Sequence, residues 1–201
     1  MSMTSHWSRS REVTVNESGP VVELRPVERD DLAFMKALSN DPHVRERVVG
    51  WDWPLTMAGQ EAWFTTSLQN PTTRRLIVQT AEGQPIGLTG LWDVDWRNRT
   101  ALTGLKLGGT ADVRNRGYGT SAIRALMDFA FLDVGLNRLY STIFADNGAS
   151  HAAYVRKSGW TEEGRLREHV WRGGRYVDLI QIGILRSDYD AIPWDDHGDT
   201  R

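Results

Sequence analysis

The chain has 201 residues, of which 40% are hydrophobic and 25% are charged, and this composition is typical of a folded domain rather than a disordered chain. The sequence contains no cysteine, which excludes disulfides, thiolate metal sites and a cysteine nucleophile. Its 24 Lys and Arg residues nearly balance 26 Asp and Glu residues, so the net charge of -2 gives no general attraction to nucleic acids.

The sequence predicts neither a membrane span nor a secretory signal. No apolar run approaches the ~18 residues that cross a bilayer, and residues 1–20 lack the central apolar stretch of a signal peptide. We therefore expect a cytoplasmic protein that has neither a membrane nor a nucleic acid as a partner. We expect a flexible leader over residues 1–20, one domain over residues 21–190 and a loose tail over residues 191–201.

The first part of this domain is expected to contain one strand and three helical segments. The strand covers Val21–Val27. Apolar residues spaced by three predict the first helix, with Asp30 or Asp31 as its cap, and they are Leu32, Met35 and Leu38. This helix should end before Pro42, because the residue before a proline avoids helical angles. Two more helical segments are expected over residues 44–49 and 56–68.

The middle of the chain changes to the period of β-strands. Three β-prone runs separated by short turn segments predict an antiparallel meander, and they are Leu76–Thr80, Ile86–Val94 and Ala101–Leu107. A long helix over Thr120–Leu132 and a strand over Leu139–Ala145 follow, which together predict one βαβ crossover.

The last part contains a short helix and a hairpin. The helix is expected over Ala149–Lys157, ending at Gly159 in the manner of a C-terminal cap. Two strand segments, Glu168–Trp171 and Tyr176–Leu185, flank Gly173-Gly174, where both central positions can take a positive φ. The order of elements predicts a mixed α+β sheet.

The segment Arg114-Asn115-Arg116-Gly117-Tyr118-Gly119-Thr120 lies between the meander and the long helix. Its glycines allow close approach to a ligand, and the unpaired amides of the first helical turn favour phosphate oxygens. A P-loop is excluded because no lysine follows Gly119. The dinucleotide pattern G-x-G-x-x-A fits residues 117–122, although the preceding strand ends too far before Gly117 for that pattern. On these residues alone, a phosphate-bearing cofactor and a plain loop leading into the helix both stay open.

The same segment resembles the R/Q-x-x-G-x-G/A loop with which GCN5-related N-acetyltransferases hold the pyrophosphate of acetyl-CoA. Arg114, Gly117 and Gly119 occupy its three defining positions. The resemblance covers about residues 21–190 and is strongest to the branch that acetylates ribosomal-protein N-termini, polyamines and small amines. Other matching segments follow in order: Ser39-Asn40-Asp41-Pro42, Phe129-Ala130-Phe131, Asn147 with Ser150, and Gly173-Gly174-Arg175-Tyr176-Val177-Asp178.

The resemblance implies a fold and a place for the cofactor. The fold is α+β, with a mixed, mostly antiparallel sheet, a central splayed pair of parallel strands and helices on both faces. The cofactor arm would lie where the strands over 101–107 and 139–145 separate, and backbone groups would polarise its thioester. The implied acetyl-CoA-binding residues are Leu105, Lys106, Leu107, Arg114, Asn115, Arg116, Gly117, Tyr118, Gly119, Thr120, Asn147 and Ser150. Asn147 and Ser150 can equally serve as ordinary helix caps.

Tyr154 is the implied catalytic residue, because relatives place a tyrosine seven residues after the asparagine to protonate the departing thiolate. The segment from Tyr154 to Gly159 has one residue more than is usual in the family, and a π-bulge or a shifted cap would absorb it. The strand that often carries a general base has no carboxylate here. Asp93, Asp95, Glu168 or an amine that arrives neutral are therefore left as alternatives.

Tryptophans beside acidic residues suggest an acceptor pocket for a cationic amine. The candidate substrate-binding residues are Trp51, Trp53, Trp92 and Asp93. We expect an acetyl-CoA-dependent enzyme that transfers the acetyl group directly to a primary amine, which can be a protein N-terminus, a polyamine or a small metabolite or antibiotic. No metal is expected, and a homodimer is left open. The alternatives are a catalytically silent acyl-CoA-binding or regulatory module and an NAD(P)-binding reductase.

Overall fold

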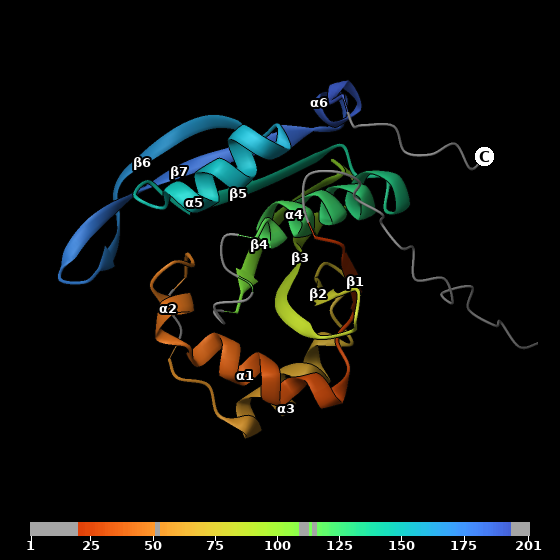
Figure 1. The fold of residues 1–201 in the computed structure, drawn as a ribbon, viewed down its shortest axis with the longest axis vertical. Helices are drawn as coiled ribbons and strands as arrows, with labels where there is room; N and C mark the ends of the chain where they lie inside the picture. Colours follow the sequence, from red (N-terminus) through yellow and green to blue (C-terminus); the bar gives the residue numbers. More distant parts are fainter. Residues whose placement is uncertain (1–19, 51–52, 109–112, 114–115, 194–201) are drawn as a thin grey trace, which may run out of the picture.

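The computed structural model describes residues 20–50, 53–108, 113 and 116–193. Its centre is a sheet of seven strands in the order β1-β2-β3-β4-β5-β7-β6 (Figure 1). The strands are β1 (Val22–Pro26), β2 (Arg74–Thr80), β3 (Pro85–Asp95), β4 (Thr100–Leu107), β5 (Arg138–Phe144), β6 (Thr161–Arg172) and β7 (Arg175–Leu185). The described neighbours pair antiparallel except β4 and β5, which are parallel. The predicted α+β fold class is confirmed.

Six α-helices and three short segments of other helix types accompany the sheet among the described residues. The α-helices are α1 (Leu32–Asn40), α2 (Pro42–Arg45), α3 (Met57–Ser67), α4 (Tyr118–Asp128), α5 (Gly148–His151) and α6 (Arg186–Ala191). The others are the 3-10 turn η1 (Arg29–Asp31) and the π-helical segments η2 (Phe129–Asp133) and η3 (Ala152–Arg156). Within the part of the chain that the structure describes, no helix has the length and apolar character needed to span a bilayer.

The helices cover both faces of the sheet, as the alternation of side chains along β2 requires. Ile77 of β2 pairs with Leu88 of β3, and both pack against apolar residues of α1. Val78 points to the opposite face and packs in a cluster with alanines of α4. Figure 1 accordingly shows α1 and α3 on one side of the strands and α4 on the other.

Several predicted elements need correction at their ends. The second helix begins at Pro42, because Asp41 accepts a hydrogen bond from the His43 amide and proline is well suited to the first helical position. Asp31 does not cap α1 with its side chain. Its carboxylate instead accepts hydrogen bonds from the Arg25 guanidinium at 2.7 and 2.8 Å and from the Glu28 amide at 2.8 Å.

The later elements also differ in extent from the prediction. The long helix passes into the π-helical segment η2 after Asp128, β6 begins at Thr161 rather than Glu168, and α6 was not predicted. The Gly173-Gly174 turn is confirmed, with φ values of 57° and 79°. The predicted leader and most of the predicted tail, residues 1–19 and 194–201, lie outside the described residues.

The parallel pair β4–β5 separates along its length. The strands pair over three positions, from Thr100 with Arg138 to Leu102 with Tyr140, although β4 continues to Leu107 and β5 to Phe144. One side-chain bond follows the last pair, from the buried Ser141 hydroxyl to the Thr103 carbonyl at 2.7 Å. The sheet therefore opens between the carboxyl-terminal ends of its two central strands.

Candidate active site

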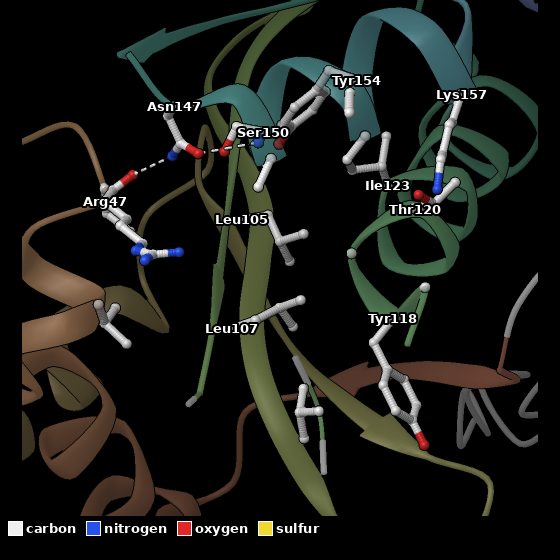
Figure 2. A pocket seen from close by; sticks show the side chains of 18 of the residues that line it. Arg47, Leu105, Leu107, Tyr118, Thr120, Ile123, Asn147, Ser150, Tyr154 and Lys157 are labelled. Atoms are coloured by element: carbon white, nitrogen blue, oxygen red, sulfur yellow. Dashed lines mark hydrogen bonds between the residues drawn. The ribbon is translucent and has the colours of Figure 1, made fainter. Parts of the chain in front are cut away.

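A cleft of about 560 Å³ lies at this opening. Its walls come from the end of β4, the first turn of α4, the helix formed by α5 and η3, and the segment around α2 (Figure 2). Nine of the residues predicted for acetyl-CoA or catalysis line it together: Leu105, Leu107, Gly117, Tyr118, Gly119, Thr120, Asn147, Ser150 and Tyr154. These residues are spread over fifty positions of the sequence, so it is the fold that gathers them around one space.

The first turn of α4 presents its backbone to the cleft. Gly117 is the N-cap in a left-handed conformation, with φ of 92°, and no side chain caps the helix there. The amides that open the turn belong to Tyr118, Gly119 and Thr120, and such amides have no partner within the helix. Among the described residues, a Cβ at Gly119 would meet only the Leu107 side chain, at 3.7 Å, which leaves space above this glycine. This arrangement suits phosphate oxygens.

The remaining loop residues are placed differently. Arg114 and Asn115 lie outside the described residues, and Arg116 does not line the cleft. Lys106 is also absent from the lining, because side chains alternate along β4 and those of Leu105 and Leu107 take the cleft side. The described β4–β5 pairs end at Leu102, and residues 105–107 continue β4 along the cleft beyond them.

Asn147 joins two walls of the cleft. Its Oδ1 accepts a hydrogen bond from the Ser150 amide at 3.1 Å, which makes it the N-cap of α5. Its Nδ2 donates to the Arg47 carbonyl at 3.1 Å, a contact drawn in Figure 2. The capping role considered from sequence is therefore present, and Asn147 additionally holds the segment after α2 against α5.

Tyr154 lies within the five-residue π-helical segment η3, so the extra residue before Gly159 is absorbed by a π-bulge, one of the two solutions predicted. Gly159 ends the helix with φ of 73°. The Tyr154 ring packs edge-on against Trp160, with centroids 5.0 Å apart, and its side chain points toward Ser150 at the cleft (Figure 2). Burial raises the pKa of the Tyr154 hydroxyl well above its usual value, so this group is neutral and can donate a hydrogen bond.

Three of the residues predicted for the acceptor, Trp53, Trp92 and Asp93, do not line the cleft. Trp51 lies outside the described residues, and Trp53 is 76% exposed. Trp92 and Asp93 lie toward the other end of the strands, because β3 runs antiparallel to β4 and its Gly87, not Trp92, pairs with Leu107. Asp95 accepts two hydrogen bonds from Asn98, which hold the pKa of its carboxyl below the usual value.

Three basic side chains line the cleft that sequence analysis did not select: His43, Arg47 and Lys157. Lys157 lies three residues after Tyr154, a helical spacing that was available as a signal. The sequence carried no signal that α2 approaches α5, so His43 and Arg47 could not be found. None of the described lining residues is Asp or Glu.

The comparison with known families decides between the cofactors considered for this cleft. Residues 22–160 match the family model described as an acetyltransferase (GNAT) domain. The chain belongs to the GNAT acetyltransferase family. It is an acetyl-CoA-dependent N-acetyltransferase, and the cleft with its open helical turn fits that cofactor. The NAD(P)-binding reductase considered from sequence is not supported.

Relatives of this GNAT enzyme have two kinds of acceptor in their names. The spermidine N(1)-acetyltransferase of Vibrio cholerae is 26% identical over 167 residues, which cover 83% of this chain and 94% of that protein. The crystal structure of a V. cholerae spermidine N-acetyltransferase with CoA and spermine has a TM-score of 0.78 at 25% identity, covering 84% of this chain and 97% of that one. A putative ribosomal N-acetyltransferase of Bacillus subtilis is 28% identical over 110 residues, covering 55% and 58% of the two chains.

Proposed function

We propose that this GNAT enzyme carries out direct transfer of the acetyl group to a primary amine in the cleft, with polyamines as the first acceptor class to test. The observation that carries this proposal is the separation of β4 and β5 after three residue pairs, because it opens one space to the α4 first turn, the β4 backbone and Tyr154. The names of the spermidine acetyltransferases that match most of this chain support the acceptor class.

The cofactor would be held at its two ends by different groups. The pyrophosphate fits the amides of Tyr118, Gly119 and Thr120, and Lys157 extends toward Thr120, where it adds a positive charge (Figure 2). The pantetheine arm fits along β4, where the backbone of residues 105–107 offers hydrogen bonds in the manner of an added strand. Acetyl-CoA supplies the activated thioester, and the protein supplies its orientation.

In the transfer, the amine nitrogen attacks the thioester carbonyl, the new C–N bond forms and the C–S bond breaks. The proton lost by the nitrogen balances the proton that the sulfur gains. A thiol has a pKa near ~8.5 and tyrosine near ~10, and burial raises the pKa of Tyr154 further. Complete proton transfer from Tyr154 is therefore uphill, and its role is to donate a hydrogen bond to the developing thiolate.

The amine attacks with a lone pair, so it must be deprotonated, and a positively charged side chain in the cleft favours the deprotonated amine. A positive charge near a bound ammonium disfavours the protonated form and lowers its pKa. Arg47 points into the cleft from the α2 side and can exert this effect (Figure 2). With no carboxylate among the described lining residues, an amine that arrives neutral is preferred over the general bases considered from sequence.

The test is turnover against a panel of amines that includes spermidine, spermine, a peptide with a free N-terminus and a small monoamine. Free thiol and the mass of one added acetyl group on the acceptor are measured together. A Gly119→Val variant, whose side chain fills the open space at the α4 turn, is the inactive control. Tight acetyl-CoA binding without turnover of any amine would favour the silent binding module instead.

A further inference from the structure

Arg172, the last residue of β6, contacts three separate segments of the chain. Its Nη1 donates to the Glu46 carbonyl just after α2, and its Nη2 donates to both carboxylate oxygens of Asp146, at 3.1 and 2.9 Å. Its guanidinium also stacks on the Phe144 ring, 4.0 Å from the centroid. One side chain thus joins the end of the β6–β7 hairpin to α2 and to the turn between β5 and α5.

These contacts lie directly behind the cleft wall. Glu46 precedes Arg47 and Asp146 precedes Asn147, and both Arg47 and Asn147 line the cleft. Asn147 also donates a hydrogen bond to the Arg47 carbonyl. The hydrogen bonds of Asn147 and Arg172, together with the peptide links Glu46–Arg47 and Asp146–Asn147, therefore form a closed ring. Figure 1 shows the β6–β7 hairpin reaching toward α2.

The wall that this ring supports lies across the cleft from the α4 first turn, the site proposed for the phosphates. We define the α2 wall as the lining residues His43, Val44, Arg47 and Val48. In Figure 2, Arg47 approaches β4 from one side, whereas Tyr118, Thr120 and Lys157 lie on the other. The α2 wall is therefore available to the acceptor amine, while the α4 turn is left to acetyl-CoA.

We infer that Arg172 is a positioning residue for the acceptor side of the active site. By fixing Glu46 and Asp146 at once, it sets the distance between the α2 wall and the start of α5. The kinetic consequence of this inference rests on the proposed acetyl transfer, whereas its structural consequence is independent of that proposal. Loss of the Arg172 contacts leaves the Asn147–Arg47 hydrogen bond in place but should make the α2 wall more mobile, and it leaves the α4 first turn untouched.

The neighbouring Arg175 provides a matched control. It donates to the same Asp146 carboxylate at 3.1 Å, yet it is 69% exposed, and the described contacts join it neither to Glu46 nor to Phe144. The test compares Arg172→Met, which keeps an apolar stem but loses every donor, with Arg172→Lys and Arg175→Met. Lys retains the charge but not the planar fork that contacts two partners together.

Two measurements are made on each intact variant, of which the first needs no acceptor. Amide hydrogen exchange should become faster in residues 42–48 of Arg172→Met, remain unchanged in residues 121–128, and stay as in the unaltered chain for Arg175→Met. Steady-state kinetics should show the KM for the acceptor raised about tenfold, with the KM for acetyl-CoA within twofold, because small misplacements near a reacting group are costly. Arg172→Lys should recover part of both effects.

Equal exchange in Arg172→Met and Arg175→Met would overturn the inference, as would a general loss that changes both KM values and residues 121–128 together. If the unaltered chain turns over no amine, the proposed function fails by itself. The exchange measurement then still decides whether Arg172 holds the α2 wall.

Discussion

The chemical role proposed for Tyr154 depends on its burial. With a side chain 5% exposed, it keeps its proton at every physiological pH and lines the cleft as a neutral donor. Tyr154→Phe removes the hydroxyl but preserves the ring that packs on Trp160. We expect kcat to fall about 100-fold, the scale of a lost hydrogen bond to a charge that develops in the transition state, and the affinity for acetyl-CoA to stay the same. Thiol release at saturation with both substrates measures kcat, and an unchanged kcat would exclude Tyr154 as the donor.

The raised pKa of Tyr154 also predicts how stability depends on alkaline pH. A group whose pKa is higher in the folded state than in the unfolded state stabilises fully below the unfolded pKa, and that stability is lost as the pH rises toward the folded pKa. The free energy of unfolding should therefore fall above pH ~10. Tyr189, whose pKa is also raised, contributes to the same fall. The fall in the free energy of unfolding should be smaller in Tyr154→Phe. Denaturant midpoints that fall equally with pH in both chains across this range would contradict the prediction.

Lys157 is expected to contribute to cofactor affinity through the phosphates. A hydrogen bond to a charged group contributes about 1.5–3 kcal/mol, so Lys157→Ala should weaken acetyl-CoA binding at least about tenfold. Lys157→Arg should weaken it less, because the charge remains. Calorimetry with acetyl-CoA is compared with acetyl-pantetheine, which has the arm but lacks the phosphates. A loss of affinity that is equal for both ligands would show that Lys157 acts on something other than phosphate.

At the scale of elements, substitutions at two nearby glycines where α4 begins should affect folding stability and acetyl-CoA binding differently. Gly119 has room for a methyl group and a helical position, so Gly119→Ala should raise stability by roughly 0.5–1 kcal/mol. The same methyl group lies where phosphate oxygens must approach the amides, so acetyl-CoA affinity should fall. Thermal unfolding and calorimetry measure the two effects, and unchanged affinity would remove the α4 turn from the cofactor site.

Gly117→Ala is the contrasting variant. Because φ is 92° there, a side chain is strained in this conformation, and folding stability should fall by roughly 1–2 kcal/mol. A melting temperature of Gly117→Ala equal to that of the unaltered chain would contradict this.

The elements that the sequence predicted well have strong local signals. β-prone runs bounded by turn or helix segments located β2, β3, β4 and β5, and the two glycines located the β6–β7 turn. The first half of β6 escaped because its strand is bulged between Glu162 and Gly164 and again between Leu166 and Val170, which interrupts the alternation. The six-residue α6 has one buried residue, Tyr189, too few to give a helical period.

The residues of the candidate site also divide into those that the sequence predicted and those that it did not. Gly117 and Gly119 could be found because they lie at the start of a predicted helix. Asn147 and Tyr154 could be found because the distance between them along the chain matches the family that the sequence resembles. Arg47 is brought to the cleft by tertiary contacts, which include those with Asn147 and, by way of Glu46, with Arg172. The Trp92–Asp93 pair had the right chemistry for an amine, but the antiparallel direction of β3 carries it away from the cleft.

At the scale of the whole molecule, the sheet consists of two parts with a weak direct connection. Strands β1–β4 and strands β5–β7 meet through three residue pairs, while a shared core that includes Ala101, Leu139 and Met127 of α4 spans the junction. A ligand that lies between β4 and β5 supplies the hydrogen bonds that the strands do not supply to each other. Acetyl-CoA should therefore stabilise the protein as a whole and protect residues 103–107 most.

Binding that favours the folded state stabilises it by about 2.7 kcal/mol when the ligand is at 100 times its Kd. For a chain of this length, that corresponds to a rise of roughly 5–10 °C in the melting temperature. Thermal unfolding and hydrogen exchange are measured with acetyl-CoA, with acetyl-pantetheine and with NADPH. Acetyl-CoA should raise the melting temperature most, and NADPH should not raise it. If acetyl-CoA raised it without slowing exchange in residues 103–107, the ligand would bind elsewhere, and the opening between β4 and β5 would not be the cofactor site.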